Sequence, residues 1–305
     1  MTDHPAVGLR DVTLRDGLQD EQPIPTADKL RIFEALVAAG LAEVELTSFV
    51  RPDRVPALAD AEEMCAATAS SAVVRWGLVL NERGAGRALA AGLAHLQFVV
   101  SVSAAHNVRN AGRTVEASVA ELGAIAAIAR PAGAVVGVTV ATAFGCPYQG
   151  AVPAAEVISL VGQIADLGVD SVSLADTIGT AVPGEVGSLV AAVGGRHPEV
   201  KLGLHLHDTR GLAMANAFAG LAAGAVQFDA ALGGLGGCPF APGATGNLAI
   251  EDLAHALVES GYEVGVDVDS LITASSLACT MVGRKVESHV GVAGRRFASL
   301  APSGG

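Results

Sequence analysis

The chain alternates eight times between a short apolar segment and a longer, mostly alanine-rich segment with helical spacing. Apolar runs that alternate with helical patterns are typical of strand–helix units around a parallel sheet. We expect the strands at 7–14, 41–47, 73–80, 95–103, 134–143, 169–176, 200–207 and 225–232. The helices are expected at 26–39, 83–91, 114–129, 154–167, 184–193, 212–223 and 248–260.

Eight such units predict an α/β fold, a (β/α)8 TIM barrel over residues 1–265, since barrels of this kind take about 250 residues. An open, doubly wound sheet of similar content is the alternative that the pattern leaves open. After residue 265 come a helix-like segment at 269–284 and a tail with Gly, Ser and Pro. We therefore expect a C-terminal helical extension and tail, 266–305, that packs on the barrel.

The composition restricts the partners. The 31 acidic and 19 basic residues give a formal net charge of −12, whereas nucleic acids and anionic membranes favour basic surfaces. No apolar run approaches the roughly 18 residues of a membrane span, and the N-terminus lacks the features of a secretory signal. The four cysteines form no C-x-x-C pair, which argues against a zinc ribbon or a redox dithiol. We expect a cytoplasmic enzyme that acts on a small molecule and binds neither nucleic acid nor membrane.

Polar residues follow the predicted strands at the end where the active site of such a barrel lies. They are Arg15, Asp16, Glu45, Asn81, Ser103, His106, Thr142, Asp176, His205 and His207, with a glycine-rich loop after the eighth strand. We expect these side chains to converge on one mouth.

His205 and His207 end a strand two residues apart, so their side chains share one face and can reach the same metal ion. A single barrel histidine is more often a core residue bonded to the backbone, but this pair, followed at once by Asp208, favours metal binding. With the Asp16 carboxylate and the side-chain carbonyl of Asn247 it forms a nitrogen and oxygen set that suits a partly hydrated divalent ion. We predict these four residues as the metal ligands.

Arg15, Glu45 and Asp176 are the other charged candidates. Arg15 follows a strand, where it can neutralise negative charge that develops on a substrate; an ordinary surface ion pair is the alternative. Glu45 can pair with Arg15 or carry a proton. For Asp176 we favour an acceptor that supports the site over a helix cap.

Cys238 lies among the glycines of the loop after the eighth strand, Gly-Gly-Leu-Gly-Gly-Cys-Pro-Phe. Glycines allow positive φ and give a loop the freedom to close over a substrate. A free cysteine usually packs in a core, but in this setting we predict a thiol that donates or relays a proton. A role in shaping the loop is the alternative, as is a phosphate cradle, although no Gly-Lys-Ser/Thr of a P-loop follows.

Together these stretches resemble the 3-hydroxy-3-methylglutaryl-CoA (HMG-CoA) lyase family of the DRE-TIM metallolyase superfamily. The similar stretches are 15–19, 45–50, 144–148, 205–209 and 234–252, in this order along most of the chain. The Gly-Leu-Gly-Gly-Cys-Pro-Phe-Ala loop is the most selective, because related condensing synthases share Arg-Asp-Gly and His-x-His but differ there.

The resemblance implies a barrel with one Mg²⁺ or Mn²⁺ ion on Asp16, His205, His207 and Asn247. It implies cleavage of a 3-hydroxy-3-carboxymethyl acyl-CoA, such as HMG-CoA, to acetyl-CoA and a 3-oxo acid such as acetoacetate. This is retro-Claisen chemistry, and HMG-CoA cleavage would place it in leucine degradation.

The same resemblance implies roles for the catalytic candidates. Arg15, supported by Glu45, would stabilise the acetyl-CoA enolate, and His205 would lie near the proton transfer. Cys238 would help to deliver a proton to the carbanion. For coenzyme A, the adjacent Arg284 and Lys285 resemble a basic pair of the family, with ordinary surface charge as the alternative.

The sequence departs from the family pattern at Leu14, Asp20, Gln22, Ala175 and Arg210. None is a proposed ligand, so the departures leave the 3-substituent of the substrate open. A Claisen-type synthase or pyruvate aldolase of the same superfamily is the alternative enzyme, and a catalytically silent binding barrel is the alternative from another class. We expect a homo-oligomer, either a dimer or a tetramer.

Overall fold

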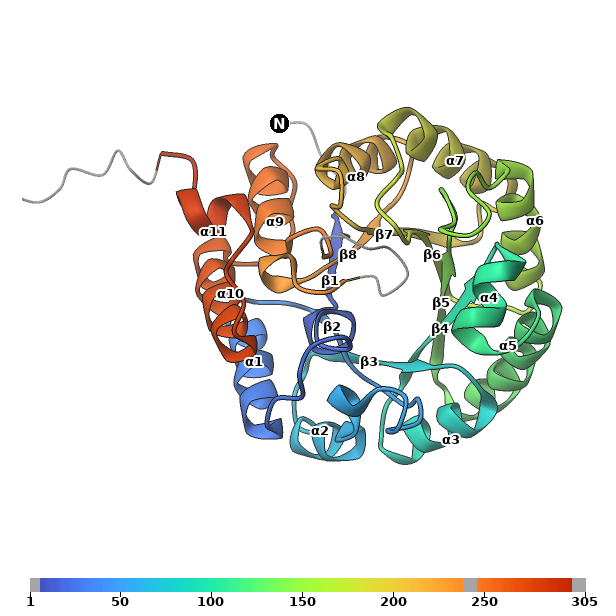
Figure 1. The fold of residues 1–305 in the computed structure, drawn as a ribbon, viewed down its shortest axis with the longest axis horizontal. Helices are drawn as coiled ribbons and strands as arrows, with labels where there is room; N and C mark the ends of the chain where they lie inside the picture. Colours follow the sequence, from blue (N-terminus) through green and yellow to red (C-terminus); the bar gives the residue numbers. More distant parts are fainter. Residues whose placement is uncertain (1–5, 238–245, 298–305) are drawn as a thin grey trace, which may run out of the picture.

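The computed structural model describes residues 6–237 and 246–297, and within them the chain forms a closed barrel of eight parallel strands (Figure 1). Each strand pairs with the next along the chain, and the last pairs with the first. The strands are β1 (Gly8–Asp11), β2 (Glu43–Ser48), β3 (Val74–Val79), β4 (His95–Ser101), β5 (Val135–Ala141), β6 (Ser171–Asp176), β7 (Lys201–Leu206) and β8 (Gln227–Ala230). The predicted TIM barrel is confirmed, and the open sheet is excluded.

The helices form a ring around the strands in Figure 1. They are α1 (Thr26–Ala38), α2 (Ala61–Ala67), α3 (Glu82–Ala90), α4 (Ala104–Ala111), α5 (Val115–Ala129), α6 (Ala154–Ala165), α7 (Pro183–Arg196), α8 (Ala213–Ala222), α9 (Ile250–Glu259), α10 (Val268–Val282) and α11 (His289–Ala293). The sequence did not predict α2, which connects β2 to β3, or α11 near the end of the described residues. It also did not predict α4, a short helix inserted between β4 and α5. Ser103 is the N-cap of α4, because its hydroxyl accepts a hydrogen bond from the amide of His106.

The first strand is shorter than predicted. The prediction of 7–14 was wrong beyond Asp11, where the chain turns into η1 (Thr13–Gly17), a single wide helical turn. Asp11 ends the strand because its carboxylate accepts hydrogen bonds from both the amide and the hydroxyl of Thr13, at 2.9 and 2.8 Å. The turn is closed by the Gly17 amide, which donates to the carbonyl of Val12.

The apolar core lies between the strands and the helices. Ile32 and Leu36 of α1, Ile125 of α5 and Ile164 of α6 are fully buried there. Burial of a side chain of this size contributes about 1.5–3 kcal/mol relative to exposure. This outer core holds the barrel closed while polar residues occupy its mouth.

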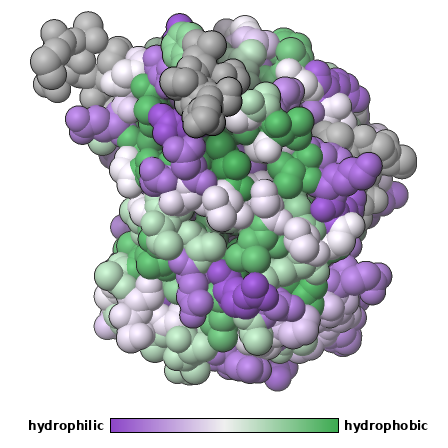
Figure 2. Space-filling view, turned by 90° about the vertical axis from the view of Figure 1, so that its left-hand side faces the viewer, coloured by the Kyte–Doolittle hydropathy of each residue, from purple (hydrophilic) through white to green (hydrophobic). Residues whose placement is uncertain are grey.

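The C-terminal helices cover one side of the barrel. Helix α10 packs against α1 and against η4 (Leu232–Gly234), and α11 packs against α9 (Figure 1). Figure 2 shows this side of the molecule, where hydrophobic and hydrophilic residues alternate in small patches. The division into a barrel (1–265) and an extension (266–305) stays a prediction. Over the described ranges, no helix is both long and apolar enough to cross a membrane.

Candidate active site

The carboxyl ends of the strands surround a cavity of about 570 Å³. Arg15 and Asp16 line it from η1, and His205 and His207 line it from the end of β7. Ser48, Asn81, His106, Thr139, Ala141, Ala175 and Thr177 contribute to its wall from the other strand ends. Of the ten residues expected at one mouth, six line this cavity: Arg15, Asp16, Asn81, His106, His205 and His207. Glu45, Ser103, Thr142 and Asp176 are not among the described residues that line it.

The Asp16 carboxylate and the two imidazoles face one another. Asp16 Oδ2 lies 3.8 Å from Nε2 of His205 and 3.7 Å from Nε2 of His207. The two Nε2 atoms are 3.3 Å apart. All three side chains are buried, and their ligand atoms lie within 4.8 Å of one another, close enough to hold one metal ion.

Each imidazole is oriented through its other ring nitrogen. Nδ1 of His207 lies 2.9 Å from the carbonyl oxygen of Thr177, so Nδ1 donates and Nε2 keeps its lone pair. Nδ1 of His205 lies 3.3 Å from Oδ2 of Asp229. Carbonyl and carboxylate partners of this kind usually fix the tautomer of a histidine that binds metal.

Asn247 reaches the site because its backbone pairs with the end of β7. Residues 207 and 247 form an antiparallel bridge, and the amide of Leu248 donates to the carbonyl of Leu206. Asn247 Nδ2 donates to Asp16 Oδ2 at 2.8 Å and to the Leu235 carbonyl, whereas its buried Oδ1 has no hydrogen-bond partner. A buried oxygen without a hydrogen-bond partner, on a side chain that contacts Asp16, fits a cation ligand.

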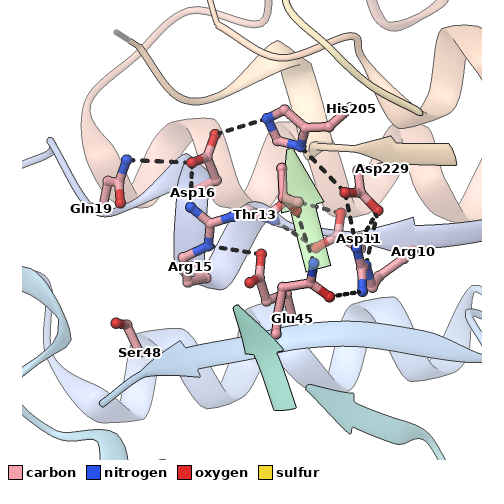
Figure 3. A network of polar contacts seen from close by, with 12 residues as sticks. Arg10, Asp11, Thr13, Arg15, Asp16, Gln19, Glu45, Ser48, His205 and Asp229 are labelled. Atoms are coloured by element: carbon pink, nitrogen blue, oxygen red, sulfur yellow. Dashed lines mark hydrogen bonds and ion pairs between the residues drawn. The ribbon is translucent and has the colours of Figure 1, made fainter. Parts of the chain in front are cut away.

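Arg15 bridges Asp16 and Glu45. Its Nε donates to Oε2 of Glu45 at 2.7 Å, and its NH1 donates to Oδ1 of Asp16 (Figure 3). Burial by itself raises the pKa of a carboxyl group, but the Arg15 guanidinium beside Asp16 holds the pKa of this carboxyl well below its usual range. The carboxylate is therefore ionised, as a metal ligand must be.

The predicted residue Asp176 and the neighbouring residue Asp208 both accept hydrogen bonds from backbone amides. The carboxylate of Asp176 accepts hydrogen bonds from the amides of Thr180 and Ala181, both at 2.9 Å. It therefore holds the loop after β6, whose Thr177 carbonyl orients His207. Asp208 accepts from the amide of Ala213 and so fixes the start of α8.

The remaining predictions concern Arg284, Lys285 and Cys238. Arg284 forms an ion pair with Glu21 at 2.8 Å, and neither it nor the exposed Lys285 lines the cavity. Cys238 lies outside the described residues. A catalytic role for Cys238 and contacts of Arg284 and Lys285 with coenzyme A stay predictions.

The sequence interpretation missed Asp229 and its partner Arg10. Arg10 donates from Nε and NH2 to the two carboxylate oxygens of Asp229, at 2.8 and 2.9 Å. Burial raises the pKa of Asp229, but Arg10 and His205 outweigh it and lower the pKa to about 2. The sequence signal for this pair was a basic residue in the first predicted strand and an acidic residue in the last. A closed barrel makes those two strands neighbours.

The donor set suits a divalent cation, with one carboxylate oxygen, two imidazole nitrogens and one amide oxygen. A parallel eight-stranded barrel with this set at the carboxyl ends of its strands defines a metal-binding TIM-barrel enzyme. The family model described as HMGL-like matches residues 6–278, and the chain belongs to that family. It is an HMG-CoA lyase-like acyl-CoA lyase.

Similar proteins cover nearly the whole chain. The (R)-citramalyl-CoA lyase of Chloroflexus aurantiacus is 40% identical over 97% of this chain and 98% of its own length. A hydroxymethylglutaryl-CoA lyase of Bacillus subtilis is 36% identical over 93% of this chain and 95% of its own length. The structure of an HMG-CoA lyase from Acinetobacter baumannii with coenzyme A and 3-methylmalate superposes with a TM-score of 0.92, at 38% identity and 98% coverage of both chains.

Proposed function

We propose that the protein cleaves HMG-CoA, or a close 3-hydroxy-3-carboxymethyl acyl-CoA, to acetyl-CoA and a 3-oxo acid such as acetoacetate. The observation that supports this best is the cluster of Asp16, His205 and His207 beside the Arg15 guanidinium in one cavity. Cleavage of HMG-CoA would place the protein in leucine degradation.

The cation in this proposal is Mg²⁺ or Mn²⁺, held by Asp16, His205, His207 and the free Oδ1 of Asn247. When bound, it supplies Lewis acidity toward the 3-hydroxyl and the carboxylate of the substrate. The residues themselves keep the donors in place, because each imidazole and the Asn247 amide are anchored by a second hydrogen bond.

The reaction breaks the C2–C3 bond of the thioester. A base accepts the proton of the 3-hydroxyl, the O–H electrons form the new carbonyl at C3, and the C2–C3 bonding pair becomes the enolate of acetyl-CoA. Arg15 lines the cavity and has N–H groups beyond the two that bind Glu45 and Asp16, so it can donate to the thioester oxygen as charge develops there. In this proposal, His205 lies near the 3-hydroxyl group that loses its proton.

The enolate must then gain a proton at C2. We assign this step to the Cys238 thiol, since the described cysteines, Cys65, Cys146 and Cys279, are all buried. Burial raises the pKa of Cys65 and of Cys279 to about 11, which makes those thiols poor proton donors at neutral pH.

Four arginines at the rim of the cavity are candidates for the phosphates of coenzyme A. They are Arg51, Arg54, Arg109 and Arg113. Arg109 stacks on Tyr148, with its guanidinium carbon 4.1 Å from the ring centroid, which holds that charge at the rim. Arg51 forms an ion pair with Asp53 and Arg113 forms one with Glu121. Arg54 and Arg109 are therefore the stronger candidates for an anionic substrate in a chain of net charge −12.

Citramalyl-CoA is the second candidate substrate, and the 40% identity with a citramalyl-CoA lyase favours it. It differs from HMG-CoA by one methylene between C3 and the carboxylate, so the same bond breaks but pyruvate replaces acetoacetate. The missing methylene brings the carboxylate one bond closer to the 3-hydroxyl, so relative rates on the two thioesters will report which spacing the site fits. Both thioesters therefore belong in the same assay.

The deciding experiment measures acetyl-CoA release from each thioester with Mg²⁺, with Mn²⁺ and with EDTA. We expect metal-dependent release together with acetoacetate from HMG-CoA or pyruvate from citramalyl-CoA. Condensation of a 2-oxo acid with acetyl-CoA, without cleavage of either thioester, would identify the synthase instead. Absence of turnover together with absence of metal binding would favour the silent barrel.

A further inference from the structure

A buried charge pair lies inside the barrel next to the candidate metal site. Barrel interiors are usually filled by branched apolar side chains, yet Arg10 and Asp229 are each only 3% exposed. The register pairs Arg10 of β1 with Asp229 of β8, and Asp229 with His205 of β7. Three neighbouring strands thus bring these side chains into one layer, as Figure 3 shows.

Arg10, Asp229 and His205 form a chain of contacts that ends at the metal site. Arg10 donates two hydrogen bonds to the two carboxylate oxygens of Asp229, which fixes the plane of that carboxylate. Asp229 Oδ2 in turn lies 3.3 Å from Nδ1 of His205. Nε2 of the same ring points to Asp16 and His207.

Arg10 is itself held from two further sides. Its NH1 donates to Oε1 of Gln97 at 2.8 Å, and its guanidinium carbon lies 4.9 Å from the centroid of Trp76. Gln97 Nε2 donates to the Thr139 hydroxyl, which lines the cavity. Gly137 makes room for this amide, because a Cβ there would lie 2.6 Å from Gln97 Oε1. The guanidinium therefore has one defined position.

Stability alone does not explain this pair. A buried ion pair carries a large desolvation cost, and apolar residues of similar volume often stabilise a fold equally well. His207 is oriented by a neutral backbone carbonyl, whereas His205 is oriented by a carboxylate whose charge needs a buried counterion. Arg10 supplies that counterion.

We propose that Arg10 is a positioning residue for the cation site: through Asp229 it fixes the orientation and tautomer of His205, so that Nε2 faces Asp16 and His207. The proposal rests on one part of the proposed function, the binding of a divalent cation at this site. It does not depend on which thioester is cleaved.

The test compares the Mn²⁺ affinity of the wild-type chain with Arg10→Met and Arg10→Lys by calorimetry. We expect Arg10→Met to weaken the affinity about 10–100-fold, the usual effect of losing a partner behind a metal ligand. Arg10→Lys keeps the charge but not the two-pronged contact, so it should rescue the affinity in part. Arg75→Met is the matched control, since Arg75 of β3 donates its hydrogen bonds to Cys65 and Thr68, outside the cavity.

A second readout is the tautomer of His205, measured by ¹⁵N NMR of the metal-free protein. We expect the proton on Nδ1 in the wild-type chain and a mixture of tautomers in Arg10→Met. A folded Arg10→Met with wild-type affinity and tautomer would overturn the proposal. If Arg10→Met does not fold, wild-type affinity in Arg10→Lys would overturn it. A wild-type chain that binds Mn²⁺ but cleaves no thioester would refute the proposed function and leave this test valid.

Discussion

At the scale of single residues, His207 and Asn247 each keep one atom free for the cation, because the other polar atom of the side chain donates hydrogen bonds to the protein. His207 donates from Nδ1 to a backbone carbonyl, and Asn247 donates from Nδ2 to Asp16 and to Leu235. The lone pairs of His207 Nε2 and Asn247 Oδ1 are then left for the cation. Such fixed donors need little rearrangement on binding.

We expect His207→Ala to weaken Mg²⁺ or Mn²⁺ binding, because it removes one ligand nitrogen and opens a buried space beside Asp16. Calorimetry measures this directly. His197→Ala, at the end of α7 and outside the cavity, serves as the control. Unchanged affinity in His207→Ala would remove this residue from the ligand set.

Arg15→Lys tests the role of the guanidinium. Lysine cannot donate to Glu45, Asp16 and the substrate in one plane, so we expect kcat to fall about 10²–10³-fold, the usual cost of losing one donor to a developing oxyanion. Steady-state kinetics with the preferred thioester measures this. A wild-type kcat would contradict the assigned role.

Cys238→Ala separates chemistry from metal binding. We expect a large loss of turnover, because the proposed proton donor is removed, while the affinity for Mn²⁺ stays at the wild-type value. An equal loss of both would show that the thiol acts through the shape of the loop.

At the scale of elements, the glycine-rich segment after β8 lets the backbone approach Asn247. Gly236 has φ +119°, and a Cβ there would lie 2.5 Å from Asn247 Nδ2. Gly246 faces the Gly234 carbonyl so closely that any side chain would displace it. The glycines are therefore required by close contacts at these positions and not by flexibility alone.

We expect Gly236→Ala to displace Asn247 and to weaken Mn²⁺ binding, with a strain cost of about 1–3 kcal/mol for the backbone. Gly237→Ala is the matched control, since a Cβ there meets no atom of the described residues within 4 Å. Calorimetry gives the affinity and thermal unfolding gives the stability. Equal metal affinity in the two variants would contradict this account of the loop.

The sequence predicted elements better than it predicted contacts between them. The apolar and helical periodicities predicted all eight strands, and the His-x-His pattern predicted the histidine pair of the candidate metal site. Both signals are local in the sequence. Arg10 and Asp229 lie 219 residues apart, and only the β1–β8 closure brings them together. The end of β1 was also missed, since the Asp11 hydrogen bonds to Thr13 override an apolar run.

At the scale of the whole molecule, buried histidines make the stability depend on pH. Burial lowers the pKa of His106 from its ordinary value of 6.5 to about 4. Below pH 6.5 the unfolded chain therefore binds a proton that the folded chain does not, so this residue destabilises the fold as the pH falls toward 4.

We expect His106→Gln to flatten the loss of stability between pH 6.5 and 4, by about 3 kcal/mol at most. Urea unfolding at several pH values measures the difference. A steeper dependence in the variant would show that the sign is wrong.

The assembly state belongs to the same scale. Val292 and Phe297, near the C-terminal end of the described residues, are 75% and 63% exposed. We keep the prediction of a dimer or tetramer, which light scattering on the purified protein can check. A monomer at micromolar concentration would refute it.

The most direct test of the metal site is anomalous diffraction from crystals of the protein soaked with Mn²⁺. We predict one strong peak between Asp16, His205 and His207, within bonding distance of Oδ1 of Asn247 and of both Nε2 atoms. A peak elsewhere, or no peak in this cavity at saturating Mn²⁺, would contradict the central claim.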